Sequence, residues 1–182
     1  MLVAVAAAGA AIAAPAAVQV AVDNSRGGCA VVGGFEVQAP PGVAWDVLHD
    51  YDHIPRFVRS MVSSRAERRS DGRLFVSQVA RAGFFLFRRS VHVELLIDEE
   101  PLVRIGFHDV LGRDFRDYQG EWRIEAGSAV TRVRYAHEAE PRAALPRSMC
   151  RGVLQHTARD LLEQVRAEIL RRAHGVDPPR SP

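Results

Sequence analysis

Lysine is absent from this 182-residue chain, and all 24 of its basic residues are arginine. The protein therefore has no residue that could form a Schiff base or serve as a lysine nucleophile. Cysteine is scarce, since Cys29 and Cys150 are the only two, and two cysteines alone cannot build a structural zinc site. They can pair in an oxidising compartment, but their spacing does not decide this, and two unrelated thiols is the simpler interpretation.

Several catalytic and phosphate-binding motifs are also missing. The sequence has no GxSxG, and Gly33-Gly34 lies inside a strand-like run that leads into no helix, so no phosphate-binding loop is present. Cys150 and His156 are six residues apart on one predicted helix, which places them on different faces. We therefore expect no cofactor, and neither a serine- nor a cysteine-nucleophile enzyme is indicated.

Length and charge point to one ordinary globular domain. A chain of this size suits a single core, and its 47% hydrophobic content is enough to pack one. A net charge of +2 does not suggest a nucleic-acid partner.

The two ends of the chain differ from the middle. Residues 1–22 are uncharged, apolar and Ala-rich, with small-residue sites at 11–13 and 14–16, and they resemble a secretory signal that lacks a basic start. We expect export to the periplasm or the extracellular space; a membrane anchor or a cytoplasmic chain with an Ala-rich leader are the alternatives. Residues 23–29 are predicted to be a linker, residues 30–174 a ligand-binding domain, and residues 175–182, with three prolines, a disordered tail.

The middle of the chain reads as one strand, two short helices, a run of strands and one long helix. The first strand is residues 31–39, and Pro41 suits the first turn of the helix that follows. Asp50-Tyr51-Asp52 breaks that helix, and Asp52 is predicted to cap a second short turn at 53–58. Alternating apolar residues predict further strands at 61–69, 74–80, 84–97, 103–110, 115–124 and 130–136. Apolar residues at three- and four-residue steps predict a helix over 146–173.

Two clusters of polar residues have both a functional and a structural interpretation. His49 and His53, four residues apart, would share a face as metal ligands on a continuous helix, but the break between them argues against a metal site.

Residues 56–89 hold nine arginines and two acids, whereas residues 90–125 hold nine acids and four arginines. Cross-strand pairing explains these blocks better than an anion-binding surface built from Arg65, Arg68, Arg69 and Arg73.

Some polar residues alternate with apolar ones on strand faces that should point inward. They are Gln78, Asp109, Tyr118 and Tyr135. For each one alone, a hydrogen bond to a neighbouring side chain or a buried water is the simpler explanation, but together they favour a pocket.

Four segments in order resemble the polyketide cyclase/dehydrase and coenzyme Q-binding branch of the START-like (SRPBCC) superfamily. The segments are Trp45–Leu48 with Tyr51–Val58, then Gln78, then residues 120–124 (GEWRI) and 131–135 (TRVRY). The resemblance implies an α+β helix-grip fold: a curved, seven-stranded antiparallel sheet around a long C-terminal helix, two short helices after the first strand, and a cavity between sheet and helix. It implies no invariant catalytic residues.

Members of this branch bind isoprenoid quinones or other apolar ligands, cyclise polyketides, or associate with ribosomes, so three functions stay open. The first is a carrier or sequestering protein for a quinone, lipid or polyketide-like molecule, with possible transient membrane contact. Its candidate ligand-binding residues are Gln78, Phe85, Phe87, Phe107, Tyr118, Trp122 and Tyr135. The second is a cyclase or dehydratase, with Asp109 and His137 as weak catalytic candidates. The third is a macromolecular interaction module that uses the Arg-rich strands. We favour the carrier, which needs no catalysis and no metal; the oligomeric state stays open.

Overall fold

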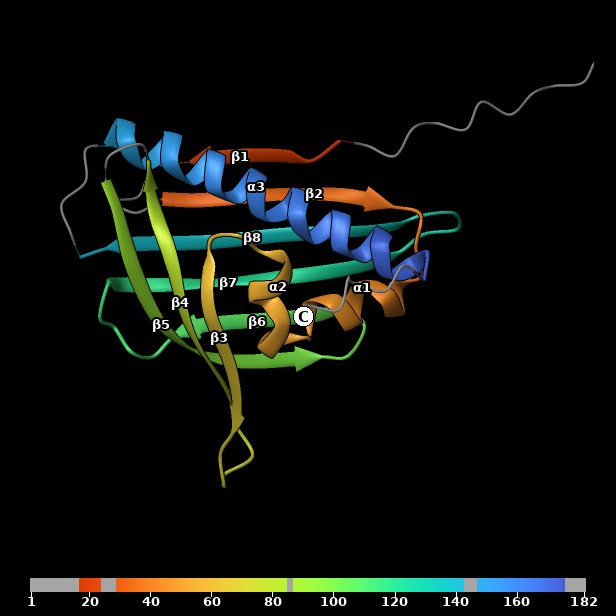
Figure 1. The fold of residues 1–182 in the computed structure, drawn as a ribbon, viewed down its shortest axis with the longest axis horizontal. Coiled ribbons are helices and arrows are strands. Elements are labelled where there is room, and N and C mark those ends of the chain that lie inside the picture. Colours follow the sequence, from red (N-terminus) through yellow and green to blue (C-terminus); the bar gives the residue numbers. More distant parts are fainter. Residues whose placement is uncertain (1–16, 24–28, 85–86, 143–146, 176–182) are drawn as a thin grey trace, which may run out of the picture.

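The computed structural model describes residues 17–23, 29–84, 87–142 and 147–175, with the backbone alone for 82–84, 87–88 and 147–151. Its elements, in chain order (Figure 1), are β1 (Gln19–Asp23), β2 (Cys29–Val37), α1 (Pro41–Leu48), the 3-10 turn η1 (Tyr51–His53), α2 (Ile54–Phe57), β3 (Met61–Arg68), β4 (Leu74–Phe84), β5 (Phe87–Glu100), β6 (Arg104–Asp109), β7 (Phe115–Ala126), β8 (Thr131–Pro141) and α3 (Arg147–Ala173).

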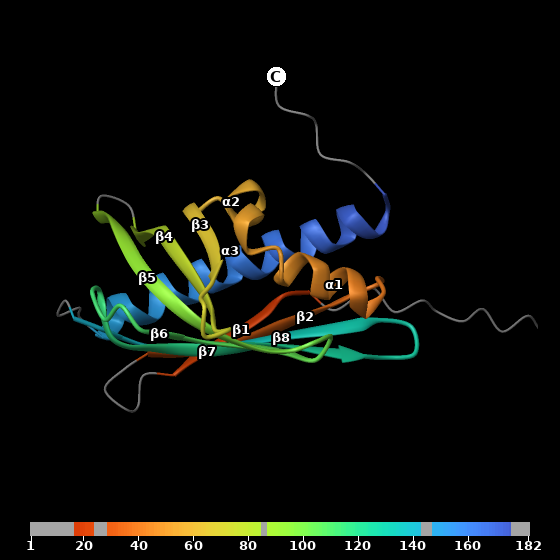
Figure 2. The same ribbon diagram turned by 90° about the horizontal axis from the view of Figure 1, so that it is seen from below.

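All the described strands belong to one antiparallel sheet in the order β1-β2-β8-β7-β6-β5-β4-β3. Figure 2 shows the helices on one face of this sheet, with β3, β4 and β5 rising from the plane of the other strands toward the helices. The sheet thus curves around α3, which is the α+β helix-grip arrangement predicted from the sequence. The predicted strands correspond to β2 through β8.

One strand was not expected. Residues 19–23 form β1, which pairs with β2 from Gln19 opposite Gly34 to Asp23 opposite Ala30, so the sheet has eight strands. Val18, just before β1, is 8% exposed and packs into the core. The Ala-rich composition of residues 1–22 conceals this short edge strand in the sequence.

The two-residue alternation of the strands separates the faces of the sheet. In β6, Ile105 and Phe107 are buried on the concave face, and Arg104 and His108 point the other way. Leu162, Val165 and Ile169 of α3 fill the concavity from above. Helix α3 approaches β2 at Gly33, where a Cβ atom would lie 2.6 Å from Leu162 Cδ1 and 2.7 Å from the backbone oxygen of Gln19. Because that oxygen belongs to the paired strand β1, a side chain at this position would disturb the sheet.

The two short helices between β2 and β3 form where they were predicted, but one predicted contact in this segment is absent. Helix α1 begins at Pro41 and buries Ala44, Val47 and Leu48, and the break at Asp50 is present. The prediction that Asp52 caps the next turn is wrong, because its Oδ1 accepts the Ala66 N–H of β3 at 2.8 Å. That bond holds the short helical turns against the edge strand.

The predicted pairing between the basic residues 56–89 and the acidic residues 90–125 includes Arg69 with Glu94 at 2.8 Å and Arg89 with Asp114 at 3.2 Å. Charged residues outside these two blocks also pair across strands on the convex face. Arg132 bonds Glu36 at 2.5 Å from the directly opposite position on β2, and Arg134 lies 3.1 Å from Glu125. Cys29 at the start of β2 is disulfide-bonded, which is contrary to the interpretation as an unrelated thiol, and the side chain of Cys150 lies outside the described residues.

Candidate ligand-binding cavity

A cavity of about 120 Å³ lies between the concave face of the sheet and the helices. Strands β4 to β8 form its floor, and α3 closes it from above with Leu161 and Val165. Residues 50–59, here called the cap segment, close one side with Tyr51, Ile54, Phe57 and Val58. The remaining lining residues are Val47, Leu48, Met61, Val76, Gln78, Leu95, Ile97, Ile105, Phe107, Tyr118, Trp122 and Tyr135.

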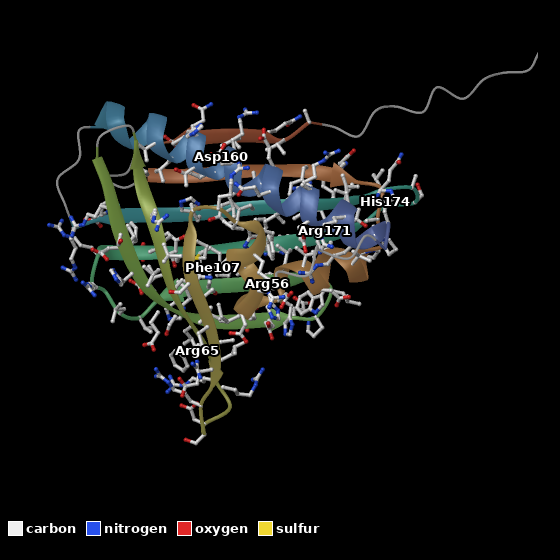
Figure 3. All side chains as sticks on the ribbon, in the orientation of Figure 1. Arg56, Arg65, Phe107, Asp160, Arg171 and His174 are labelled. Atoms are coloured by element: carbon white, nitrogen blue, oxygen red, sulfur yellow. The ribbon has the colours of Figure 1, made fainter. Side chains whose placement is uncertain are left out.

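Four of the predicted ligand-binding residues form one aromatic wall on β6, β7 and β8. The Trp122 and Tyr135 rings are 4.3 Å apart between centroids, and Phe107 lies 5.8 Å from Tyr118 and 6.4 Å from Tyr135. Figure 3 shows Phe107 inside the outline of the molecule, whereas Arg65 lies out toward the β3–β4 hairpin.

Gly120 on β7 makes room for this wall. A Cβ atom there would lie 2.6 Å from Phe107 Cζ and 2.7 Å from His137 Cβ. A side chain at this position would push the rings out of their places, so the glycine shapes the polar end of the cavity.

Gln78 lines the cavity from β4, as predicted, but its amide has a protein partner. Its Nε2 donates to Ser64 Oγ at 3.2 Å. Gln78 is therefore oriented by the structure itself, and its carbonyl oxygen is the group a ligand could use.

The hydroxyl groups of Tyr118 and Tyr135 form the polar end of the cavity, here called the polar pole. Burial raises the pKa of both, and their mutual interaction lowers that of Tyr118 and raises that of Tyr135. Both side chains are therefore neutral at physiological pH and can donate a hydrogen bond as well as accept one.

The two weak catalytic candidates have different surroundings. The Asp109 carboxylate accepts the backbone N–H groups of Glu94, Leu111 and Gly112 at 3.0 to 3.1 Å, so it holds the β6–β7 loop in place. His137 lies beside the polar pole, with ring centroids 5.7 Å from Tyr118 and 5.2 Å from Tyr135. Its buried Nδ1 has no hydrogen-bond partner among the described residues, and burial lowers the pKa of the imidazole to about 4.

Two of the predicted ligand-binding residues have no described side chain. Phe85, and the side chain of Phe87 at the start of β5, lie outside the described residues. Their assignment as ligand-binding residues stays a prediction.

Sequence reasoning missed a hydrogen bond made by Tyr51, which lines the cavity from the cap segment. The Tyr51 hydroxyl donates to Glu99 Oε1 at 2.6 Å, and His49 Nε2 lies 3.5 Å from the same oxygen. Burial, followed by the bond to Glu99, raises the pKa of Tyr51, so the phenol keeps its proton. A signal for this was present: Glu99 continues the inward alternation of Val93, Leu95 and Ile97.

The two residues considered as metal ligands bind different partners. His53 Nδ1 lies 2.6 Å from Asp50 Oδ1, whereas His49 faces Glu99. In the part of the chain that the structure describes, no group of three His, Cys, Asp or Glu side chains is arranged to hold a metal ion.

Three of the four arginines considered as an anion-binding surface have partners within the protein, and the first of them, Arg68, donates to the Gly72 carbonyl at 2.8 Å. Arg69 pairs with Glu94 at 2.8 Å and stacks 3.6 Å from the centroid of Phe75, and Arg73 pairs with Asp71 at 2.6 Å. These contacts support the structural interpretation of the basic strands.

Comparisons with known proteins agree with this architecture. Residues 37–166 match the family model described as "Polyketide cyclase / dehydrase and lipid transport". The chain belongs to this family. Similar solved structures include the Zhui aromatase/cyclase from Streptomyces sp. R1128, which is 19% identical with a TM-score of 0.67 over 79% of this chain and 94% of that one.

Two further solved structures share the fold. A STAR-related lipid transfer protein fragment from Xanthomonas axonopodis is 14% identical, with a TM-score of 0.68 over 86% of this chain and 98% of that one. Human STARD10 is 16% identical, with a TM-score of 0.68 over 88% and 72%. At these identities the structures establish the START helix-grip fold. No curated protein sequence matches the chain.

No helix within the described ranges combines the length and the apolar character needed to cross a membrane.

Proposed function

We propose that this protein binds a neutral, largely apolar small molecule in the cavity between the sheet and α3, as a carrier or sequestering protein. The observation that carries the proposal is the chemistry of the cavity wall. No described residue that lines the cavity is charged, and its polar groups are phenols, one indole and one amide. A ligand with a hydroxyl or carbonyl group at one end of an apolar body matches this wall.

The lack of a cation in the described wall argues for selectivity against acids. A buried carboxylate or phosphate without a partner costs several kcal/mol, because the cavity cannot replace its hydration. Free fatty acids and phosphorylated lipids are therefore disfavoured, whereas a quinone, a phenol or a neutral lipid is acceptable.

The size of the cavity bears on the form of the ligand. A cavity of about 120 Å³ is comparable with an engineered apolar cavity of about 150 Å³ that holds benzene, and ligand sites usually measure about 300–1,000 Å³. In this conformation the space suits one ring. A longer ligand requires the cap segment to move away from α3.

A matched pair of probes tests the proposal. We expect 4-propylphenol to bind at least about tenfold more tightly than 4-propylbenzoate, since they differ mainly in charge at the polar end. Titrations followed by methyl NMR should place the shifts on Val76, Ile105 and Val165. Tyr118→Phe should weaken phenol binding, and Gln119→Ala, on the convex face of the same strand, should not. Equal binding of both probes, or shifts confined to the convex face, would contradict the proposal.

His137 supports an enzyme of the cyclase type as the second candidate. Its imidazole lies beside Tyr118 and Tyr135, behind the residues that line the cavity, and Nδ1 is unpaired among described residues, so it can accept a proton from the carbon α to a ligand carbonyl. Its pKa of about 4 makes it a weak base at neutral pH, which is why this function ranks second. The two functions separate in one variant. His137→Leu should abolish cyclised product from a poly-β-keto thioester while leaving the affinity for 4-propylphenol nearly unchanged. Product formed at the wild-type rate would exclude this role.

We further propose that the protein is exported. The apolar run at residues 1–22 and the disulfide at Cys29 support an oxidising compartment. A cytoplasmic protein would keep this cysteine reduced.

A further inference from the structure

Two exposed aliphatic pairs flank strand β6, one before it and one after it. Leu102 and Val103 precede β6 and are 50% and 41% exposed, and Val110 and Leu111 follow it and are 44% and 48% exposed. These pairs are nearly equal in apolar exposure, so any difference in what they bind comes from their surroundings.

Acidic residues surround the first pair. Asp98 and Glu100 are exposed at the end of the neighbouring strand β5, and Arg104, which begins β6, bonds Asp98. Glu99 between them points inward to Tyr51. Across the sheet Arg123 pairs with Glu121 at 2.5 Å. The nearby arginines are thus matched by carboxylates, and this end of β6 repels anions.

Basic side chains surround the second pair. Arg89, 69% exposed, reaches Asp114 at 3.2 Å, and Arg142 Nε donates to the Gly112 carbonyl at 2.7 Å. Arg116 is 62% exposed, and Arg113 is exposed on the loop itself. These four arginines lie on the loop that carries the two aliphatic side chains, contact it or directly follow it.

The acids near the second pair face mainly inward. Asp109 accepts three backbone N–H groups, and Asp114 is 9% exposed and accepts the His92 N–H at 2.8 Å. Asp117 and Glu140 are the more solvent-exposed carboxylates, and Glu140 pairs with Arg116 at 3.1 Å. The solvent-facing charge of this loop is therefore net positive.

The loop is rigid and adjoins the cavity. The two hydrogen bonds from Leu111 and Gly112 to Asp109 fix its backbone, so the aliphatic side chains are presented at little entropic cost. Phe115 at its end stacks on Tyr118, with ring centroids 4.9 Å apart, and Tyr118 lines the cavity. In Figures 1 and 2 this loop lies at the same end of the molecule as the end of β4, the start of β5 and the start of α3.

We propose that the β6–β7 loop docks the protein on an anionic lipid bilayer, with Val110 and Leu111 entering the interface and the surrounding arginines contacting the headgroups. The inference rests on the proposed function, because a membrane is where a carrier can load and release apolar molecules. Apolar side chains in a basic ring suit such a surface, and each arginine near an anionic leaflet strengthens binding about fivefold.

Vesicle co-sedimentation tests the docking surface with a matched control. The wild type should bind phosphatidylcholine vesicles that contain phosphatidylglycerol, bind pure phosphatidylcholine weakly, and lose binding as salt rises. Val110→Asp with Leu111→Asp should abolish this binding. Leu102→Asp with Val103→Asp, which makes the same change in equally exposed residues at the acidic end, should leave it intact. Arg113→Ser with Arg116→Ser should weaken it about 25-fold.

The outcome separates docking from ligand binding. Equal losses in the two aspartate pairs, or a wild type that ignores anionic vesicles, would overturn the docking proposal. Titration of the same folded proteins with 4-propylphenol reports on the cavity alone. Intact phenol binding without vesicle binding therefore rejects only the docking surface, and vesicle binding without phenol binding rejects only the cavity function.

Discussion

The Asp50 carboxylate and the Arg172 guanidinium form a 2.7 Å ion pair that joins the cap segment to the last turns of α3. Glu168 accepts from Arg172 and Arg171 at 2.7 Å, and His53 lies 2.6 Å from Asp50. The cap segment, which would have to move for a long ligand to enter, is therefore held to α3 by ion pairs. Breaking such partly exposed ion pairs costs less free energy than breaking a buried apolar contact.

We expect removal of this pair to loosen the cap segment without unfolding the protein. Asp50→Asn and Arg172→Gln should each lower the free energy of unfolding by about 1 kcal/mol, with a coupling of about 0.5 kcal/mol in the double-mutant cycle. Urea unfolding measures both. Strict additivity of the two changes would show that the ion pair contributes nothing.

The same pair predicts a response to acid. Burial raises the pKa of Asp50, but the bonds from Arg172 and His53 outweigh it, so the pKa lies below its usual value. A depressed carboxyl pKa stabilises the fold above the ordinary value of about 4, and this contribution disappears as the pH falls through the folded-state value. The free energy of unfolding of Asp50→Asn should therefore fall less steeply below pH 4 than that of the wild type.

His137 predicts a second pH dependence in a higher window. Its folded pKa is about 4 against an ordinary 6.5, because burial disfavours the imidazolium. The unfolded chain binds the extra proton first, so stability declines as the pH falls from 6.5 to 4, by on the order of 3 kcal/mol. His137→Leu should flatten this decline in chemical unfolding measured at several pH values. His108→Gln, on the convex face, serves as control, and an unchanged slope in His137→Leu would contradict the prediction.

The bond between Tyr51 and Glu99 should stabilise the closed cap segment. Tyr51→Phe leaves a largely buried carboxylate without its hydrogen-bond donor and should lower the free energy of unfolding by about 1–3 kcal/mol. Glu99→Gln keeps an acceptor for the phenol, so its effect should be smaller. Thermal unfolding of the two variants measures the difference; a larger loss in Glu99→Gln would show that the phenol is not what matters.

Strand β1 constrains any processing of the amino terminus. Both candidate cleavage sites, at residues 11–13 and 14–16, precede Val18, so cleavage at either would keep β1 in the sheet. Intact mass of the exported protein should place its first residue before Val18. A form that lacks residues 1–23 would expose the edge of β2 and should melt at a lower temperature than one that lacks residues 1–16, and equal melting temperatures would mean that β1 adds no stability.

The sequence determined most of the fold because its apolar periodicity is strong. Alternation such as Ile105 and Phe107 against Arg104 and His108 identifies strands, and the three- and four-residue spacing of Leu162, Val165 and Ile169 identifies α3. Strand β1 was not predicted, because its five residues at the end of an Ala-rich run show too little alternation of apolar and polar side chains. The hydrogen bond of Asp52 to Ala66 was not predicted, because an Asp that caps a helix and an Asp that bonds a neighbouring strand cannot be told apart in the sequence.

The candidate site was less predictable because it depends on distances between remote elements. The inward positions of Phe107, Tyr118, Trp122 and Tyr135 follow from strand alternation, and the structure brings them to one wall. The Tyr51–Glu99 bond joins residues 48 positions apart, and no local pattern specifies it. The volume of the cavity depends on how far the sheet bends, which residue types alone do not fix.

Native mass spectrometry of the full chain purified from its own host, followed by organic extraction, tests most directly whether the cavity carries a neutral guest. The account predicts a bound species that organic solvent releases, that carries no acidic group, and whose occupancy falls in Tyr118→Phe and not in Gln119→Ala. A protein that carries no such species under native conditions, or one that carries an acid whose occupancy is the same in both variants, would contradict it.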